Sequence, residues 1–205
     1  RVGMATSCLL LFYLPRWLAE FHRHHPAVEI TLSEANSDRL LAALHDGELD
    51  VAIVGMTGAP TPGIATHVAA DEALVAAVSR TDPLIGRAAI TLKALHQRAL
   101  ISLPRGTGLR ASLDGACAKA GFEPHIVFEA SDPNVLAQFA IRGFGVAILP
   151  ESIANAYPTS LHAIAIARPG LRARLDLAWK AEGPTSPAAR ALIAHTRTAL
   201  EVQRG

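Results

Sequence analysis

Hydrophobic positions in the first third of the chain alternate between strand-like and helix-like spacing. The pattern predicts strands near 2–4, 28–33 and 49–54, with a helix after each of the first two. The segment 49–54 (LDVAIV) is almost continuously apolar, which is typical of a parallel strand covered on both faces. Leu14, Trp17 and Phe21 recur at helical spacing, and Gly47 is placed to end the second helix. This third is therefore predicted to be β-α-β-α-β.

The same pattern returns in the second half of the chain. It predicts strands near 100–102, 125–129 and 145–149, again separated by helices. Asp132 followed by Pro133 is typical of a helix start, because Asp caps the first N–H groups and Pro fits the first helical position. The remaining predicted elements are strands at 64–69, 73–79, 161–166 and 175–179, a short helix near 92–97, and a last helix from 186.

Two β-α-β-α-β units in succession predict an α/β fold made of two Rossmann-like subdomains, because right-handed crossovers make each unit a parallel sheet. We expect subdomain I to comprise 1–75 plus 161–205, and subdomain II to comprise 76–160. Ligands of such sheets bind outside the carboxyl ends of the strands. If the two units face each other, the turns at these ends line one cleft.

Several of these turns carry a hydroxyl group beside a predicted helix start. Thr6, Ser7, Ser37 and Thr107 occupy such positions, and helix N-termini attract anions. The alternative is that each hydroxyl only caps its own helix. Arg105 is a candidate partner for a carboxylate or phosphate, or else a solvated loop residue.

Composition excludes several classes of protein. Charged residues make up 18 %, and the formal net charge is +1, which argues against a disordered chain and against a bare nucleic-acid-binding module. Two cysteines, Cys8 and Cys117, cannot form a disulfide framework, and both lie in apolar surroundings typical of buried thiols. Cys8 at a helix start leaves thiol redox sensing as an alternative.

Motifs that carry catalysis or metal binding are missing from the sequence. The chain has no GxSxG, GxGxxG, GxxxxGK[ST] or HExxH motif, and no window as apolar as a membrane span. His22, His24 and His25 have no nearby Cys or carboxylate partner, so a solvated helix end is favoured over a metal site. We expect neither an enzyme nor a bound cofactor or metal.

The amino-acid sequences of three segments resemble the effector-binding domain of LysR-type transcriptional regulators. These are Leu14–Gly55, including Gly47-Glu48-Leu49-Asp50, then Ala73–Leu84 (ALVAAVSRTDPL) and Arg142–Ser152 (RGFGVAILPES). The resemblance covers essentially the whole chain in the right order. It implies two α/β subdomains joined by two crossover strands, a fold like that of type 2 periplasmic binding proteins, with the inducer between them.

The resemblance places effector contacts at Ser7 or Cys8, at Ser37 and in the 104–107 turn. Together with the strand-end turns, the predicted effector-binding residues are Thr6, Ser7, Cys8, Asn36, Ser37, Met56, Ser102, Arg105, Thr107, Asp132 and Pro133. Asp132 would repel an anion at its end. An effector with one acidic group and one donor group therefore fits better than a simple dicarboxylate.

The function predicted from the sequence is sensing of a small organic-acid-like effector for a transcription factor. The alternative is a solute-binding protein of a transporter. The resemblance implies a cytoplasmic homodimer, a tetramer in the full-length protein, formed through the helices around 10–24 and 109–120. DNA would be contacted only through a winged helix-turn-helix that precedes this domain. Because the chain opens on Arg, we interpret it as a fragment that lacks this module.

Overall fold

The computed structural model divides the chain into two compact α/β units. It describes residues 2–6, 14–56, 61–167, 170–183 and 186–204. Unit 1 consists of 1–70 with 174–205, and unit 2 of 71–173. These boundaries differ from the predicted ones at 75/76 and 160/161. The segment 161–166 falls in unit 2, because it pairs with Val75–Ser79 of that unit.

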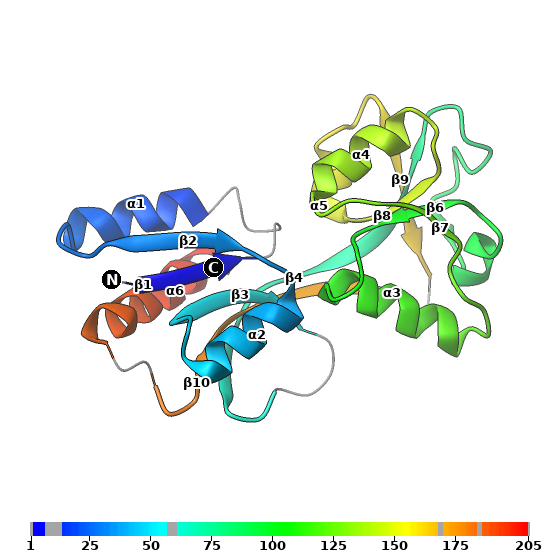
Figure 1. Cartoon of the computed structure of the whole chain (residues 1–205). Helices are drawn as coiled ribbons and strands as arrows, with labels where there is room; N and C mark the ends of the chain where they lie inside the picture. The colour runs from blue at the N-terminus through cyan, green and yellow to red at the C-terminus, as the bar shows by residue number, and fades with distance from the viewer. Residues whose placement is uncertain (1, 7–13, 57–60, 168–169, 184–185, 205) are drawn as a thin grey trace. The chain divides into compact units, whose positions relative to one another are not determined.

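Unit 1 holds a mixed sheet whose first three strands are parallel (Figure 1). Its elements are β1 (Val2–Thr6), α1 (Leu14–His24), β2 (Ile30–Glu34), α2 (Ser37–Asp46), β3 (Val51–Gly55), the first part of β4 (Ile64–Ser79), most of β10 (Arg172–Lys180) and α6 (Pro187–Arg204). The strand order is β2-β1-β3-β10-β4, and β10 runs antiparallel to β3. The predicted β-α-β-α-β arrangement is therefore present.

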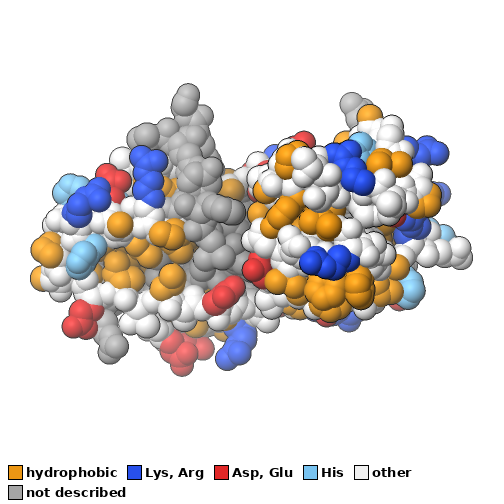
Figure 2. All heavy atoms as spheres, turned by 90° about the horizontal axis from the view of Figure 1, so that it is seen from above, with side chains coloured by type: hydrophobic (Ala, Val, Ile, Leu, Met, Phe, Trp, Pro, Cys, Tyr) orange, Lys and Arg blue, Asp and Glu red, His pale blue; other side chains and the backbone are white. Residues whose placement is uncertain are grey.

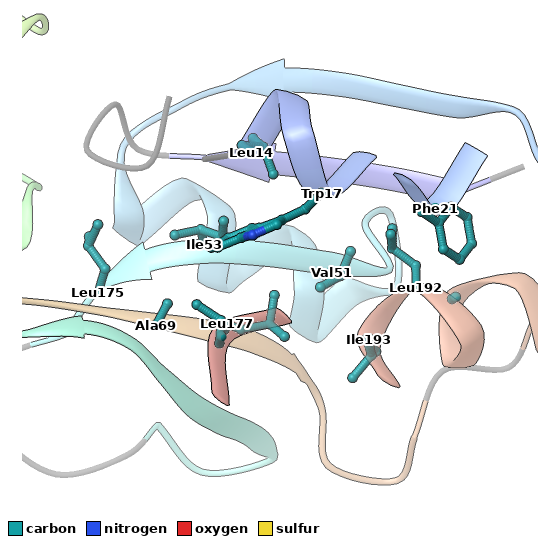
Figure 3. Close-up of a cluster of buried hydrophobic side chains, with 12 residues drawn as sticks. Leu14, Trp17, Phe21, Val51, Ile53, Ala69, Leu175, Leu177, Leu192 and Ile193 are labelled. Atoms are coloured by element: carbon teal, nitrogen blue, oxygen red, sulfur yellow. The ribbon is translucent and has the colours of Figure 1, made fainter. Parts of the chain in front are cut away.

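Unit 1 has hydrophobic clusters on both faces of its sheet. On one face Val51 and Ile53 of β3 pack with side chains of α1 and α6 (Figure 3). On the other face Ala52 and Val54 pack with α2. Successive side chains of a strand point to opposite faces, so a strand covered on both must be apolar at every position. This explains the continuous apolar run in the sequence.

Unit 2 repeats the β-α-β-α-β pattern of unit 1, with other strands beside it in the sheet. Its elements are the rest of β4, β5 (Ala89–Ile90), the 3-10 helix η2 (Leu92–Leu95), β6 (Leu100–Ser102), α3 (Gly108–Lys119), β7 (Ile126–Glu129), α4 (Pro133–Ile141), β8 (Val146–Pro150), α5 (Glu151–Asn155) and β9 (Leu161–Ile166). β6 pairs in parallel with β7 and β8, whereas β4 is antiparallel to β8 and β9. β5 and α5 were not predicted, since two- and five-residue elements are too short to show a period.

The single strand β4 replaces the two strands predicted at 64–69 and 73–79. Asp71 and Glu72 interrupt the apolar pattern there, which is why the sequence suggested a break. The chain passes from unit 1 to unit 2 at this point. The backbone of β4 stays extended across this boundary. Its side chains up to Ala70 belong to unit 1, and those from Asp71 belong to unit 2.

Among the helices in the described part of the chain, none is both long and apolar enough to span a bilayer.

Basic and acidic side chains are scattered over the face seen in Figure 2, which agrees with the interspersed charges of the sequence. Phe144 of unit 2 is a large apolar side chain with 56 % exposure, and its ring packs edge-on against Phe139.

Gly145 precedes β8 at a close approach of two backbone segments. A Cβ at this position would lie 2.5 Å from the carbonyl oxygen of Ala99. We expect Gly145→Ala to destabilise the protein by about 1–3 kcal/mol, because the contacted atom belongs to the backbone and cannot move aside cheaply. The measurement is the free energy of unfolding in urea.

The matched control is Gly115→Ala in the middle of α3, where an added Cβ would meet no atom within 4 Å. Alanine costs less conformational entropy in a helix, so this variant should gain up to about 1 kcal/mol. Equal stability of the two variants would show that the close approach at Gly145 carries no constraint.

Candidate functional site

The carboxyl ends of the parallel strands in unit 1 lie side by side. Thr6 of β1 is in register with Glu34 of β2 and with Ile53 of β3. The residues that follow these ends include Asn36, Ser37 and Met56, all of which were predicted site residues. The backbone of Thr6 is described as the end of β1, whereas Ser7 and Cys8 lie outside the described residues.

Ser37 has a different role from the predicted helix cap. The N-cap of α2 is Asn36, whose Oδ1 accepts a hydrogen bond from the backbone N–H of Arg39 at 3.0 Å. Ser37 is buried, and its Oγ accepts from the backbone N–H of Gly55 at 2.9 Å. Two adjacent capping residues compete for one position, and Asn36 occupies it. The Ser37 hydroxyl instead links the first turn of α2 to the end of β3 and retains a hydrogen to donate.

In unit 2 the candidate residues gather around the ends of β6 and β7 and the helices that follow them. Ser102 is in register with Glu129. Thr107 is the N-cap of α3: its Oγ1 accepts from the backbone N–H of Arg110 at 3.4 Å and donates to the carbonyl oxygen of Pro104 at 2.8 Å. Thr107 therefore caps its own helix, which was the alternative to a ligand contact at this position.

Asp132 and Pro133 form the predicted start of α4. The Asp132 Oδ1 accepts from the backbone N–H of Asn134 at 2.8 Å and from its side-chain amide at 3.1 Å. Pro133 takes the first helical position and is buried. Asp132 is exposed, so its negative charge is available at this end of the sheet.

Ser102 is the polar residue of this group whose bonding is incomplete. Its side chain is fully buried at the carboxyl end of β6, and among the described residues its Oγ has no hydrogen-bond partner. Its backbone carbonyl accepts from Ala130 N at 3.3 Å. A buried hydroxyl without a partner is unfavourable by roughly 1–3 kcal/mol. A water molecule or a ligand group would relieve that cost.

Arg110 is a buried cation that the sequence analysis missed. Its side chain is 5 % exposed and forms ion pairs with Asp114, at 2.9 Å, and with Glu129 at the end of β7. Burial lowers the pKa of Arg110, but hydrogen bonds to Asp114 and Glu129 and the attraction of their charges outweigh it, so the pKa is raised. Spacing offered a signal, because Arg110 shares a helix face with Leu113 and Cys117.

Arg105 and Arg110 thus differ sharply in their exposure and in their charge partners, although they are only five positions apart. Arg105 is exposed, and no ion pair to it is formed within the described part of the chain. Arg110 is neutralised by two carboxylates. Of these two arginines, Arg105 is therefore the one open to an anionic ligand.

Cys117 lies in the core beneath α3, as predicted. Its side chain is fully buried. Burial, and to a lesser extent the nearby negative charge of Asp114, raises the pKa of its thiol to about 11. A thiol in this state is a poor nucleophile at neutral pH. In the described residues no cluster of three His, Cys, Asp or Glu side chains is arranged to hold a metal ion.

Two α/β units with polar groups at the carboxyl ends of parallel strands define a class of ligand-binding domains. The model of the LysR substrate binding domain family matches residues 1–201. The chain is 27 % identical over 189 residues to the HTH-type regulator YwbI of Bacillus subtilis, covering 92 % of this chain and 62 % of that protein. It is 30 % identical over 177 residues to a probable hydrogen peroxide-inducible genes activator of Mycobacterium avium, covering 84 % and 56 %.

Solved structures show the same fold at lower identity. The effector-binding domain of QuiR in complex with shikimate superposes with a TM-score of 0.81 at 19 % identity, covering 98 % of this chain and 97 % of that one. The regulatory domain of CcmR from Synechocystis in complex with 2-PG gives 0.82 at 20 % identity, with the same coverages. Both agree with a fold like that of type 2 periplasmic binding proteins.

The chain belongs to the LysR substrate-binding domain family. This confirms the resemblance seen in the sequence and favours a regulator over a transporter's solute-binding protein. The chain spans a little under two thirds of the length of YwbI.

The Ser37 hydroxyl gives a prediction about stability. Ser37→Ala leaves the backbone N–H of Gly55 without its acceptor, so we expect a loss of about 1–3 kcal/mol in the free energy of unfolding. Asn36→Ala removes only an exposed cap and should cost about 1 kcal/mol. Chemical denaturation of both variants provides the comparison.

Ser37→Thr is the control, because it retains the hydroxyl oxygen. A Ser37→Ala variant as stable as the wild type would mean that the bond to Gly55 contributes nothing. A larger loss for Asn36→Ala than for Ser37→Ala would mean that the Asn36 cap contributes more to stability than the hydrogen bond from Gly55 to Ser37.

Proposed function

We propose that the effector of this domain is a small organic acid held by hydroxyl groups and helix N-termini at the carboxyl ends of the parallel strands. The observation that carries the proposal is the buried Ser102 Oγ at the end of β6, which lacks a partner among the described residues. The N-cap of α3, Thr107, lies five residues after Ser102 along the chain, and the helix begins at Gly108. Its first N–H groups and dipole favour negative charge.

The charges around these strand ends set the kind of acid that fits. Arg105 is exposed and open to a carboxylate, whereas Asp132 is an exposed carboxylate that disfavours a second acidic group beside it. Ser37 has a hydroxyl hydrogen to donate in unit 1. An acid that also carries hydroxyl or amine donors suits this set better than a dicarboxylate. Of the ligands in the neighbours' structures, shikimate is an acid with hydroxyl groups, as this set favours, whereas 2-PG carries a carboxylate and a phosphate.

We propose the complete contact set predicted from the sequence, in which either Ser7 or Cys8 contributes a contact of unit 1. We further propose that the protein acts in the cytoplasm as a regulator rather than as an enzyme, and without a cofactor. DNA contact would come through a helix-turn-helix region of the kind named in the relatives. Effector binding would act on that region by favouring one arrangement of the domain.

Calorimetry after a thermal-shift panel tests the organic-acid proposal. The panel includes shikimate, 2-phosphoglycolate and aliphatic dicarboxylates, and the best binder is titrated into Ser102→Ala, Ser37→Ala, Ser7→Ala and Thr107→Ala. Loss of one neutral hydrogen bond of about 1 kcal/mol should weaken affinity about fivefold. We expect the effect in Ser102→Ala and Ser37→Ala. Thr107→Ser, which retains the hydroxyl, should bind like the wild type.

Ser79→Ala is the matched control, because Ser79 is a buried strand serine whose hydroxyl pairs with Thr81. It ends β4, which is antiparallel to β8, and so lies at the opposite edge of the sheet from the carboxyl end of β8. Unchanged affinity in all four alanine variants would place the site elsewhere. Binding of no acid in the panel would refute the proposed ligand class.

We also propose that the domain forms a homodimer through α1 and α3. The apolar stripes of these helices, which the sequence offered as the interface, are buried within their own units: Leu14, Trp17 and Phe21 in α1, and Leu109, Leu113 and Cys117 in α3. The outward side of α3 instead carries the small residues Ala111, Gly115 and Ala118. Small side chains let a partner helix approach closely.

Light scattering at tens of micromolar, roughly where a standard-sized interface holds, should give twice the chain mass of 21.6 kDa. Ala118→Glu, which places a charge on the outward side of α3, should shift the protein toward the monomer. Ala88→Glu on an exposed loop of unit 2 is the control and should leave the mass unchanged. A wild-type monomer would contradict the proposal.

A further inference from the structure

The chain passes between the two units twice, and an ion pair joins the two passages. The boundaries fall after Ala70 and after Ala173. The Arg172 Nε donates to Asp71 Oδ1 at 2.7 Å, and its Nη2 donates to the backbone carbonyl oxygen of Asp71 at 3.0 Å. One guanidinium therefore holds both the side chain and the main chain of the neighbouring strand.

On the unit 2 side of this pair, both strands are fastened to unit 2. The backbone N–H of Leu74 in β4 donates to the carbonyl oxygen of Leu171 at 2.8 Å. The carboxylate of Glu72 accepts from the backbone N–H of Ser152 at 3.1 Å, in the first turn of α5. The rotations left to the chain are thus confined to the few residues next to the boundary.

On the unit 1 side, β10 is fastened by its antiparallel pairing with the end of β3. Within β10 itself, Arg174 forms two hydrogen bonds of 2.7 Å with Asp176, whose carboxylate is fully buried. The carbonyl oxygen of Arg174 accepts from the backbone N–H of Met56 at 3.1 Å. The Arg172–Asp71 pair sits between these two sets of contacts, where it bears on both passages at once.

We propose that Arg172 and Asp71 are positioning residues that make the two passages bend together and so limit how freely the two units reorient. The side chains of Arg172 and Asp71 are 57 % and 42 % exposed, so the pair is weak and sensitive to salt. A weak contact at a boundary can break and re-form without unfolding either unit. The inference goes beyond the proposed function, because it holds whatever the effector is.

The chemistry of the pair distinguishes arginine from lysine. The planar guanidinium reaches the carboxylate and the carbonyl oxygen together, whereas an ammonium group acts as a single point charge. Arg172→Lys should therefore retain charge attraction but lose the simultaneous hold on the main chain. Asp71→Asn should lose the charge attraction.

Amide hydrogen exchange at Leu74 gives the local test, because this N–H bridges the two strands three residues from Asp71. In Asp71→Asn and Arg172→Lys we expect exchange up to about fivefold faster, the factor that corresponds to an exposed ion pair. Salt at 1 M should accelerate the wild type toward the variants. Amides in the middle of α3 and of α6 should keep their wild-type rates.

Residual dipolar couplings give the second readout, which a purely local role would not change. Couplings of the two units are fitted separately, and we expect equal alignment magnitudes in the wild type and unequal magnitudes in Asp71→Asn. The charge-swapped variant, Asp71→Arg with Arg172→Asp, should bring the magnitudes closer together again. Neither readout needs an effector, so failure here is separate from failure of the proposed ligand.

Asp46→Asn is the matched control, because the Asp46 carboxylate is also exposed and hydrogen-bonded, with its Oδ1 3.2 Å from His45 Nδ1 in α2. It should leave both the Leu74 exchange and the alignment magnitudes as in the wild type. Unchanged Leu74 exchange in Asp71→Asn would overturn the proposal. So would unequal magnitudes in the wild type, or a rise in exchange that is matched throughout both units.

Discussion

Burial of β3 on both of its faces is the constraint on which unit 1 depends. Val51 and Ile53 pack toward α1 and α6, and Ala52 and Val54 toward α2, so neither helix layer can be removed without exposing the strand. Two covered faces go with parallel pairing, because the crossover helices must lie on the faces. Parallel pairing in turn brings the strand ends to one edge. The place of the candidate site is thus a consequence of how the core is packed.

The elements that the sequence predicted well are those with a strong local signal. The repeated β-α-β-α-β pattern, the Gly47 helix end and the Asp132 and Thr107 caps follow from periodicity and from hydrogen bonds within a few residues. The role of Ser37 could not be predicted this way, because its partner, Gly55, lies 18 residues away. The unit boundaries also depended on a distant contact, the pairing of β9 with β4.

Arg110 shows a second limit of reasoning from sequence. A cation in the first turn of a helix is unfavourable toward the helix dipole and is costly to bury, so Arg110 was not among the predicted site residues. Asp114 one turn later and Glu129 on β7 supply the compensating charge. Only the second of these partners ties α3 to the sheet. The arrangement leaves Arg105 as the exposed cation of this loop and helix start, and it makes the electrostatics near Ser102 depend on a long-range pair.

The strand ends of unit 1 are also linked by hydrogen bonds to the point where the chain returns to that unit. Met56, which follows β3, donates to the carbonyl oxygen of Arg174, and Leu175 is in register with Gly55. Gly55 in turn donates to the Ser37 hydroxyl. The Ser37 hydroxyl is therefore connected to Arg174, the first residue of β10 that belongs to unit 1, through two hydrogen bonds and the Gly55–Met56 peptide bond. A ligand that binds this hydroxyl would act at the start of that path. Since a ligand shifts an equilibrium only by binding one state better, this short path is where binding at the strand ends and bending at the passages can affect each other.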